Sequence, residues 1–185
     1  MRRSLRLSTG LLGILLLLPC LALLGCTPRI PDRVTAEEMA LYSEWLKSRF
    51  ADKTPEHLYI DDQTFIYDPT NHRQCDSLHK DQGVSSSLCK RLHELGNAEY
   101  GLEFSSGSFN LPWPYQVLNP RRMPVGTPTT LHIIGFSRIA FNRGHSEALF
   151  AISDSCGGEC GGGGPVHARK VDGAWKFTYI AGWIY

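Results

Sequence analysis

The stretch PVHARKVDGAWKFTY, residues 165–179, is the part of the chain that decides the fold. Asp172-Gly173 is a strong hairpin signal, because both positions of a two-residue turn need a positive φ that Asp and Gly tolerate. The turn predicts that Val171 lies opposite Ala174, and opposite residues share a face of a sheet. One face of this hairpin is therefore expected to enter the core through its apolar residues: Val166, Ala168, Trp175, Phe177 and Tyr179.

Two more strands are expected ahead of this hairpin. Residues 129–141 form one long strand candidate, in which alternation gives a shared apolar face to Leu131, Ile133, Ile139 and Phe141. A turn at 142–145 leads into a returning strand over 147–153, whose apolar face holds Ala148, Phe150 and Ile152. Together with the hairpin, these segments predict a four-stranded antiparallel meander over residues 129–180.

The N-terminal half is expected to add two helices and a strand. Thr35 is a candidate N-cap, and apolar residues at helical spacing follow it, which predicts a helix over 35–51. A strand is expected over 57–67 and a short helix over 86–95, ending at Gly96. The predicted architecture is a single α+β domain, residues 35–185, with the first helix packed on the mostly antiparallel meander.

The first 25 residues have the pattern of an export signal. A positively charged start precedes an apolar run from Leu11 to Leu24, which is too short for a membrane span of about 20 residues. The run closes with Leu23-Leu24-Gly25-Cys26, which resembles the bacterial lipobox. The resemblance implies a signal peptide at 1–25, fatty acyl chains such as palmitate on Cys26, and a tether over 26–34. An ordinary cleaved signal and an uncleaved anchor are the alternatives.

Composition and charge limit the partners. The chain has 185 residues and a formal net charge of +1, with 19 basic and 18 acidic side chains. Three of the arginines lie in the signal, so the remaining chain carries 16 basic and 18 acidic side chains. Without a basic excess, nucleic acid is not an expected partner. The expected partners are a membrane, through the lipid on Cys26, and an envelope protein or a small ligand.

The residue after the lipobox cysteine bears on localisation. In lipoproteins of bacteria with two membranes, Asp at that position commonly signals retention in the inner membrane. Thr27 stands there in this chain. The expected location is therefore the cell envelope, and in a host with two membranes it is the periplasmic face of the outer membrane.

Four cysteines remain beside Cys26 after the signal is removed. Export places them in an oxidising compartment where disulfides persist. Three pairings are open, and we favour the two local ones: Cys75 with Cys89, and Cys156 with Cys160. A 15-residue loop closed by the first pair is worth about 3 kcal/mol on the chain-entropy model. A zinc site at Cys156 and Cys160 is one alternative, but their spacing lacks a second matching pair. A redox-active pair is another, but the spacing is not C-x-x-C and no helix is expected to follow.

The glycine-rich segment CGGECGGGG, residues 156–164, has no phosphate-loop chemistry. No Lys-Ser/Thr pair follows it, and the next element is expected to be a strand, so no helix N-terminus offers its amides. A disulfide closed over three residues needs unusual φ values, which glycine adopts without strain. We therefore interpret the glycines as structural, and a role at the border of a ligand site is the alternative.

A string of motifs in the C-terminal third resembles that of a family of exported bacterial proteins with no assigned activity. Its parts are S-R-x-x-F-N, C-G-x-x-C-G-x-G and D-G-x-W-K, which cover residues 137–176. The resemblance implies structural roles, and no catalytic ones, for the matching residues: Ser137, Arg138, Phe141, Asn142, Gly157, Gly161, Gly163, Asp172, Gly173 and Trp175.

No constellation of catalytic residues stands out, and no cofactor or metal is implied. The leading hypothesis is a lipid-anchored envelope module that acts by binding rather than by catalysis. A hydrolase is the alternative, with Ser155 as nucleophile beside the glycine segment and a base among His132, His145 and His167. The chain has no G-x-S-x-G nucleophile elbow, which weakens the hydrolase hypothesis. A metal-binding protein using Cys156 and Cys160 is the third hypothesis.

Overall fold

In the computed structural model the chain divides into a unit of residues 1–30 and a unit of residues 31–185. The structure describes only residues of the second unit: 33–67, 78–80, 82–96, 101–104, 107–122, 132–155, 161–180 and 182–184. The predicted signal peptide and Cys26 lie outside these residues. Within the described part of the chain, no helix has the length and apolar character needed to cross a membrane.

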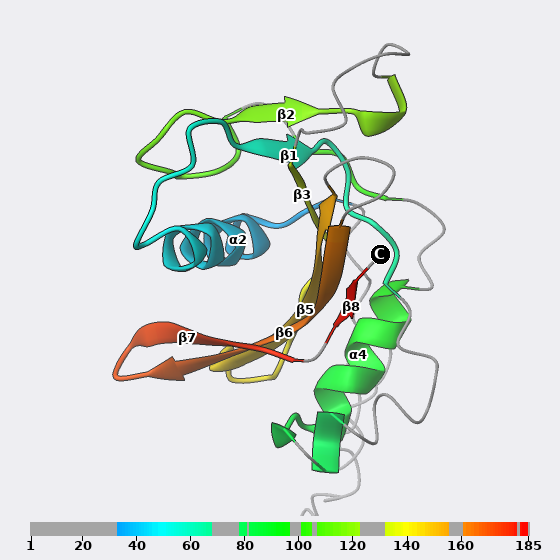
Figure 1. The fold of residues 1–185 in the computed structure, drawn as a ribbon. Helices are drawn as coiled ribbons and strands as arrows, with labels where there is room; N and C mark the ends of the chain where they lie inside the picture. Colours follow the sequence, from blue (N-terminus) through cyan, green and yellow to red (C-terminus); the bar gives the residue numbers. More distant parts are fainter. Residues whose placement is uncertain are drawn as a thin grey trace, which may run out of the picture. The chain divides into compact units, whose positions relative to one another are not determined.

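The described residues of the second unit form an eight-stranded mixed sheet at its centre (Figure 1). Six strands follow one another in the order β2-β1-β3-β5-β6-β7, while β4 pairs with β5 and β8 with β6. Their bounds are β1 Tyr59–Asp61, β2 Gln116–Leu118, β3 Ile133–Phe136, β4 Ala140–Phe141, β5 Glu147–Ser155, β6 Gly161–Val171, β7 Ala174–Tyr179 and β8 Trp183–Ile184. The expected antiparallel meander is confirmed from β3 to β7.

The β6–β7 hairpin has the register that its sequence predicts. Val171 pairs with Ala174, Lys170 with Trp175, and the alternation places Val166 and Ala168 on the same face as Phe177. Asp172 and Gly173 have φ values of 52° and 81°. Two consecutive positive φ values belong to the tight turn whose twist matches that of the flanking strands.

The single long strand expected over 129–141 is wrong, because the chain bulges between β3 and β4. Phe136 pairs with Ile152 and Ala140 with Leu149. Between these pairs, the three residues 137–139 oppose the two residues 150–151 on β5. An extra residue of this kind is a β-bulge, and it shifts the side-chain alternation by one position. Ile139 consequently joins the main core with Ile134 and Phe136, instead of sharing a face with Ile133 as expected.

Two other strand expectations need correction. The expected strand over 57–67 is regular only at β1, which pairs in parallel with both β2 and β3. Beyond β1 the chain makes only single bridges, from Gln63 to Glu103 and from Phe65 to Ser137. Residues 161–164, expected in a loop, begin β6 and pair with the end of β5. The parallel partners of β1 lie far along the chain and leave no local pattern, which is why the sequence did not indicate the parallel pairing.

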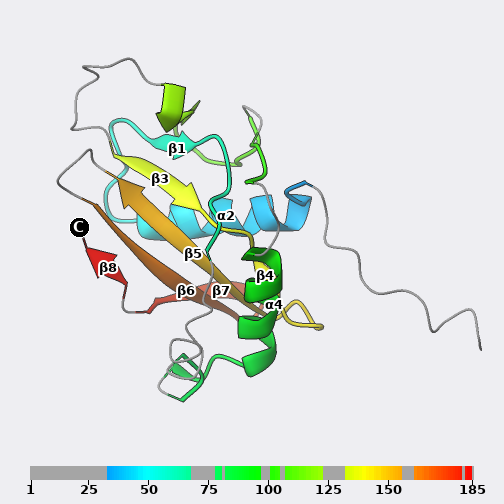
Figure 2. The ribbon, with the colours of Figure 1, turned by 90° about the vertical axis from the view of Figure 1, so that its right-hand side faces the viewer.

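Two helices cover opposite faces of the sheet (Figure 2). Helix α2 spans Ala36–Arg49 and begins with a capping box, in which Thr35 and Glu38 satisfy each other's backbone N–H. Helix α4 spans Ser86–Gly96 and buries Leu88, Cys89, Leu92 and Leu95. Both expected helices are therefore confirmed. A short 3-10 helix follows β2 at Pro120–Arg122.

The main core lies between α2 and the sheet. Its centre is an aromatic cluster in which the Tyr42 ring lies 4.5 Å from the Phe136 ring and 6.0 Å from the Phe150 ring, between centroids. Strand β5 is buried on both faces, since Phe150 and Ile152 point to α2 while Leu149 points to the α4 side. This double burial explains why β5 carries consecutive apolar residues from Ala148 to Ile152.

Candidate functional site

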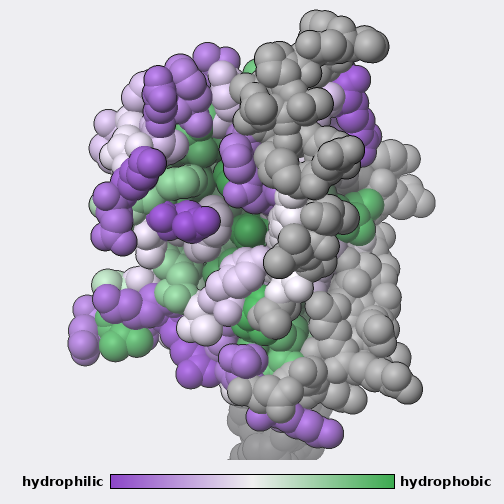
Figure 3. Space-filling view, in the orientation of Figure 1, coloured by the Kyte–Doolittle hydropathy of each residue, from purple (hydrophilic) through white to green (hydrophobic). Residues whose placement is uncertain are grey.

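A cleft of about 520 Å³ opens between the C-terminal end of α2 and the sheet. Figure 3 shows hydrophobic surface exposed among polar residues on the side of the second unit that carries α2 and β7. The cleft is lined by residues from α2, β3, β5, β6 and β7: Trp45, Ser48, Arg49, Ile134, Ile152, Asp154, Gly162, Gly163, Phe177 and Tyr179. Its volume lies in the range of small-molecule sites, roughly 300–1,000 Å³.

The floor of the cleft is apolar because it is the exposed margin of the main core. Trp45, Ile134 and Ile152 belong to the buried core cluster, and Phe177 packs against it half-buried. The β3–β5 pairing places Ile134 and Ile152 on one face of the sheet, and the hairpin register places Phe177 on the same face. An apolar floor of this kind removes hydrocarbon from water when a ligand binds.

The cleft has room at its sheet wall because glycines occupy positions that face it. Gly162 pairs with Asp154 and Gly164 with Ile152, so both glycines belong to the face that α2 covers. A Cβ atom on Gly164 would lie 3.1 Å from the Tyr179 hydroxyl and 2.6 Å from the Cα of Gly182. Glycine at position 164 lets the backbone of Gly182 approach closely, whereas Gly162, which lines the cleft, leaves space that a side chain would fill.

The rim of the cleft carries charges of both signs. Arg49 is in the last turn of α2 and Asp154 near the end of β5. Both charges act on the Tyr179 hydroxyl. Partial burial raises the pKa of Tyr179 above its ordinary value, the Arg49 charge lowers this pKa and the Asp154 charge raises it. The Asp154 Oδ1 atom also lies 3.1 Å from the His132 Nδ1 atom. The arrangement suits recognition of charged groups beside an apolar body.

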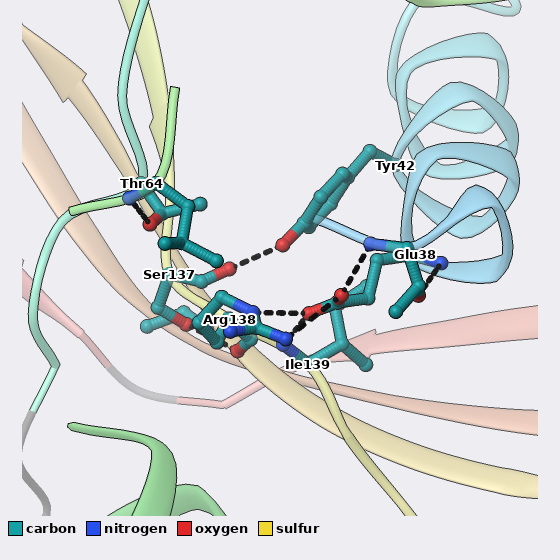
Figure 4. A network of polar contacts seen from close by, with 9 residues as sticks. Glu38, Tyr42, Thr64, Ser137, Arg138 and Ile139 are labelled. Carbon is teal, nitrogen blue, oxygen red and sulfur yellow. Dashed lines mark hydrogen bonds and ion pairs between the residues drawn. The ribbon is translucent and has the colours of Figure 1, made fainter. Parts of the chain in front are cut away.

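A second polar feature, the Glu38–Arg138 network, lies buried at the start of α2 (Figure 4). The Glu38 Oε1 atom accepts hydrogen bonds from Arg138 Nε at 2.7 Å and from the Ile139 N–H at 3.1 Å. The Glu38 Oε2 atom accepts from Arg138 Nη2 at 3.1 Å and from the Thr35 N–H at 2.9 Å. Both side chains are over 90% buried. The carboxylate is fully satisfied by this bidentate pair and two backbone donors.

The Glu38–Arg138 network extends to Tyr42 and Ser137. The Tyr42 hydroxyl donates to the Ser137 carbonyl at 2.6 Å, and burial, then the Glu38 charge, raise the pKa of Tyr42 well above its ordinary value. The Ser137 Oγ atom accepts a hydrogen bond from the Ala151 N–H at 2.8 Å and so takes the place of a backbone carbonyl at the bulge. These contacts tie α2 to the bulge and have a structural character.

Most of the other predicted motif residues make contacts or strand pairings within the described part of the chain. The Asn142 side chain accepts the Ser146 and Glu147 N–H groups and so closes the β4–β5 turn. Trp175 lies 4.9 Å from the Lys170 ammonium, and Gly163 pairs with Trp183. Phe141 stacks on His145, and Gly161 begins β6. Gly157 lies outside the described residues.

The residues of the hydrolase hypothesis are not brought together. Ser155 ends β5, and the pleat points its side chain away from the face of Asp154, which contacts His132. The His145 Nδ1 atom lies 2.6 Å from a Glu37 carboxylate oxygen. His167 bonds Glu147 and lies about 20 Å along the sheet from Ser155, as the spacing of six residues dictates. Each of the three histidines therefore contacts a carboxylate, and among the described residues none forms a hydrogen bond with Ser155.

The predicted cysteine sites are described at one position only. Cys89 lies buried in α4, with 2% of its surface exposed. Cys75, Cys156 and Cys160, and with them the predicted pairings and the predicted metal site, lie outside the described residues. In the part of the chain that the structure describes, no cluster of three or more His, Cys, Asp or Glu side chains has metal-binding geometry.

The comparisons with known proteins add no relative. No family model matches the chain, and no curated protein or solved structure matches it either. The resemblance to exported bacterial proteins therefore stays a prediction.

Sequence reasoning missed the cleft itself, whose residues come from five separate elements. The available signal was the glycine run next to the strand that carries Asp154.

Proposed function

We propose that this chain is a lipid-anchored envelope protein that binds a small ligand in the cleft between α2 and the sheet. The observation that carries the binding function is the cleft, with its apolar floor, its glycine wall and its rim of Arg49, Asp154 and Tyr179. A largely apolar pocket with a few convergent polar groups is the usual form of a small-molecule site.

The anchoring part of the proposal rests on the sequence before the second unit. The lipobox at residues 23–26 supports acylation of Cys26, and residues 27–34 then lead from the lipid to Thr35 at the start of α2. A chain of about eight residues spans at most about 29 Å when extended. The domain would therefore work close to the membrane surface and sample ligands there.

The disulfide part of the proposal concerns the α4 side. We propose a Cys75–Cys89 bridge that staples the segment before α4 to that helix, and a Cys156–Cys160 bridge in the glycine segment. Support for the first comes from the position of Cys89, which lies in α4 with 2% of its surface exposed. Export to an oxidising compartment would preserve both bridges.

Substitution of Gly162 by Leu tests the binding function. The new side chain would project beside Asp154 into the cleft and fill it. The full chain, purified in mild detergent, is dialysed against a small-molecule extract of the host envelope, and enriched compounds are identified by mass spectrometry. The matched control is Lys176→Leu, which adds a leucine to the exposed opposite face of β7.

A compound enriched by the wild type and by Lys176→Leu, but not by Gly162→Leu, supports the binding function. Absence of any compound whose enrichment depends on Gly162 contradicts it.

Intact mass of the same sample tests the anchor separately: acylation should add several fatty acyl chains, and Cys26→Ser should abolish the added mass. An unmodified wild-type mass would refute the anchor and leave the cleft untouched. Thiol counting on the denatured, unreduced chain should find no free thiol if both bridges form.

A further inference from the structure

The two charges on the cleft rim come from different walls. Arg49 belongs to α2 and Asp154 to the sheet, and both line the cleft above the same apolar floor. Arg49 lies 5.8 Å from the Phe50 ring, and no described carboxylate forms an ion pair with it. A ligand with one charge would meet one attractive and one repulsive group at this rim. A ligand with both charges would satisfy both groups.

We propose that the ligand is a small zwitterion with an apolar side group, the chemistry of a free apolar amino acid. Its carboxylate would face the Arg49 guanidinium and its ammonium group the Asp154 carboxylate. Its side group would lie on Trp45, Ile134 and Phe177, where the cleft is apolar. This inference rests on the proposed binding function and adds the class of ligand to it.

The geometry of the two charged groups supports the assignment of the ligand carboxylate to Arg49 and of the ligand ammonium group to Asp154. A guanidinium presents a planar fork that matches a carboxylate, and Arg49 is exposed and able to present it. Asp154 is half-buried, and its Oδ1 atom already contacts His132. Its second oxygen is the natural acceptor for an ammonium group.

The experiment measures the binding of four probes to the full chain by isothermal titration calorimetry. Phenylalanine carries both charges and an aromatic side group, N-acetylphenylalanine lacks the ammonium, phenylalaninamide lacks the carboxylate, and glycine lacks the side group. We expect phenylalanine to bind best. Loss of either charged contact should weaken binding by about 10- to 100-fold, the effect of a hydrogen bond to a charged group.

Variants assign each charge to its side chain. In Asp154→Asn the preference for phenylalanine over N-acetylphenylalanine should shrink, and in Arg49→Gln the preference over phenylalaninamide should shrink. Lys47→Gln, two residues earlier in α2 and paired with Glu44, is the control for Arg49. Asp172→Asn, at a turn position whose positive φ suits Asn, is the control for Asp154. Both controls should keep the wild-type preferences.

The outcomes separate this inference from the binding function. If the four probes bind equally, and Gly162→Leu abolishes their binding, the zwitterion inference is overturned and the cleft remains a binding site. Binding of none of the probes also overturns the inference, while the dialysis against envelope extract decides the binding function. Preferences that persist unchanged in Asp154→Asn and Arg49→Gln would refute the assignment of the two charges.

Discussion

Replacement of Arg138 by Met should destabilise the fold strongly, because it leaves a buried carboxylate without its cation. Glu38 accepts four hydrogen bonds, two of them from Arg138 at 2.7 and 3.1 Å, and only 2% of its side chain is exposed. Removing one partner of a buried ion pair costs about 3–5 kcal/mol. Domains of this size are stable by about 5–15 kcal/mol in total, so the loss would be a large fraction.

A double-mutant cycle isolates the pair itself. Glu38→Gln keeps the shape of the side chain and the bond to the Thr35 N–H, but it removes the buried carboxylate charge that faces the Arg138 guanidinium, so it should also cost about 3–5 kcal/mol. The double variant carries no unpaired charge. Its loss of unfolding free energy should be smaller than the sum of the two single losses by about 2–3 kcal/mol, which is the coupling energy expected for residues in one network.

Urea unfolding of the full chain, followed by tryptophan fluorescence, measures these changes. Lys47→Met is the control, since it breaks the Lys47–Glu44 pair on the exposed side of the same helix. Surface pairs contribute only about 0–1 kcal/mol. A cost below about 1 kcal/mol for Arg138→Met, or additivity within about 0.5 kcal/mol in the cycle, would refute the reasoning.

Three further perturbations test other parts of the structure. Phe150→Ala should cost about 3–5 kcal/mol in urea unfolding, because Phe150 is fully buried among the core aromatics, and a loss under about 1 kcal/mol would contradict that packing. Gly173→Val should cost about 1–2 kcal/mol, since its φ of 81° is unfavourable for a side chain; a gain in melting temperature would be inconsistent with this turn. Burial lowers the pKa of His167 against the raising effect of Glu147, so the unfolded chain binds the proton more readily. Stability should therefore fall as the pH drops below about 6.5, and less so in His167→Gln; equal pH profiles would disprove it.

Several elements could be predicted from local sequence because local physics decides them. The β6–β7 register follows from the two positive φ values at Asp172 and Gly173, which fix the turn and therefore every pair beyond it. The start of α2 follows from the reciprocal bonds of Thr35 and Glu38, three residues apart. In both cases the deciding contacts join residues that are neighbours in sequence.

The bulge between β3 and β4 was beyond local reasoning. An unbroken alternation of apolar residues predicted one strand, but Ser137 and Arg138 bond to groups on β5 and α2 that no local pattern reveals. These bonds hold one extra residue in the strand and move Ile139 into the core. The parallel pairing of β1 has the same origin, because its partners lie far along the chain.

By itself, the sequence determined the helices, the hairpin register and the pattern of an export signal, since each depends on residues close together along the chain. Only the tertiary structure decided the cleft. Arg49 and Asp154 are separated by more than half of the chain, and they line one site because α2 packs across a sheet whose wall lacks a side chain at Gly162. A site made from contacts between distant segments has no local pattern to read.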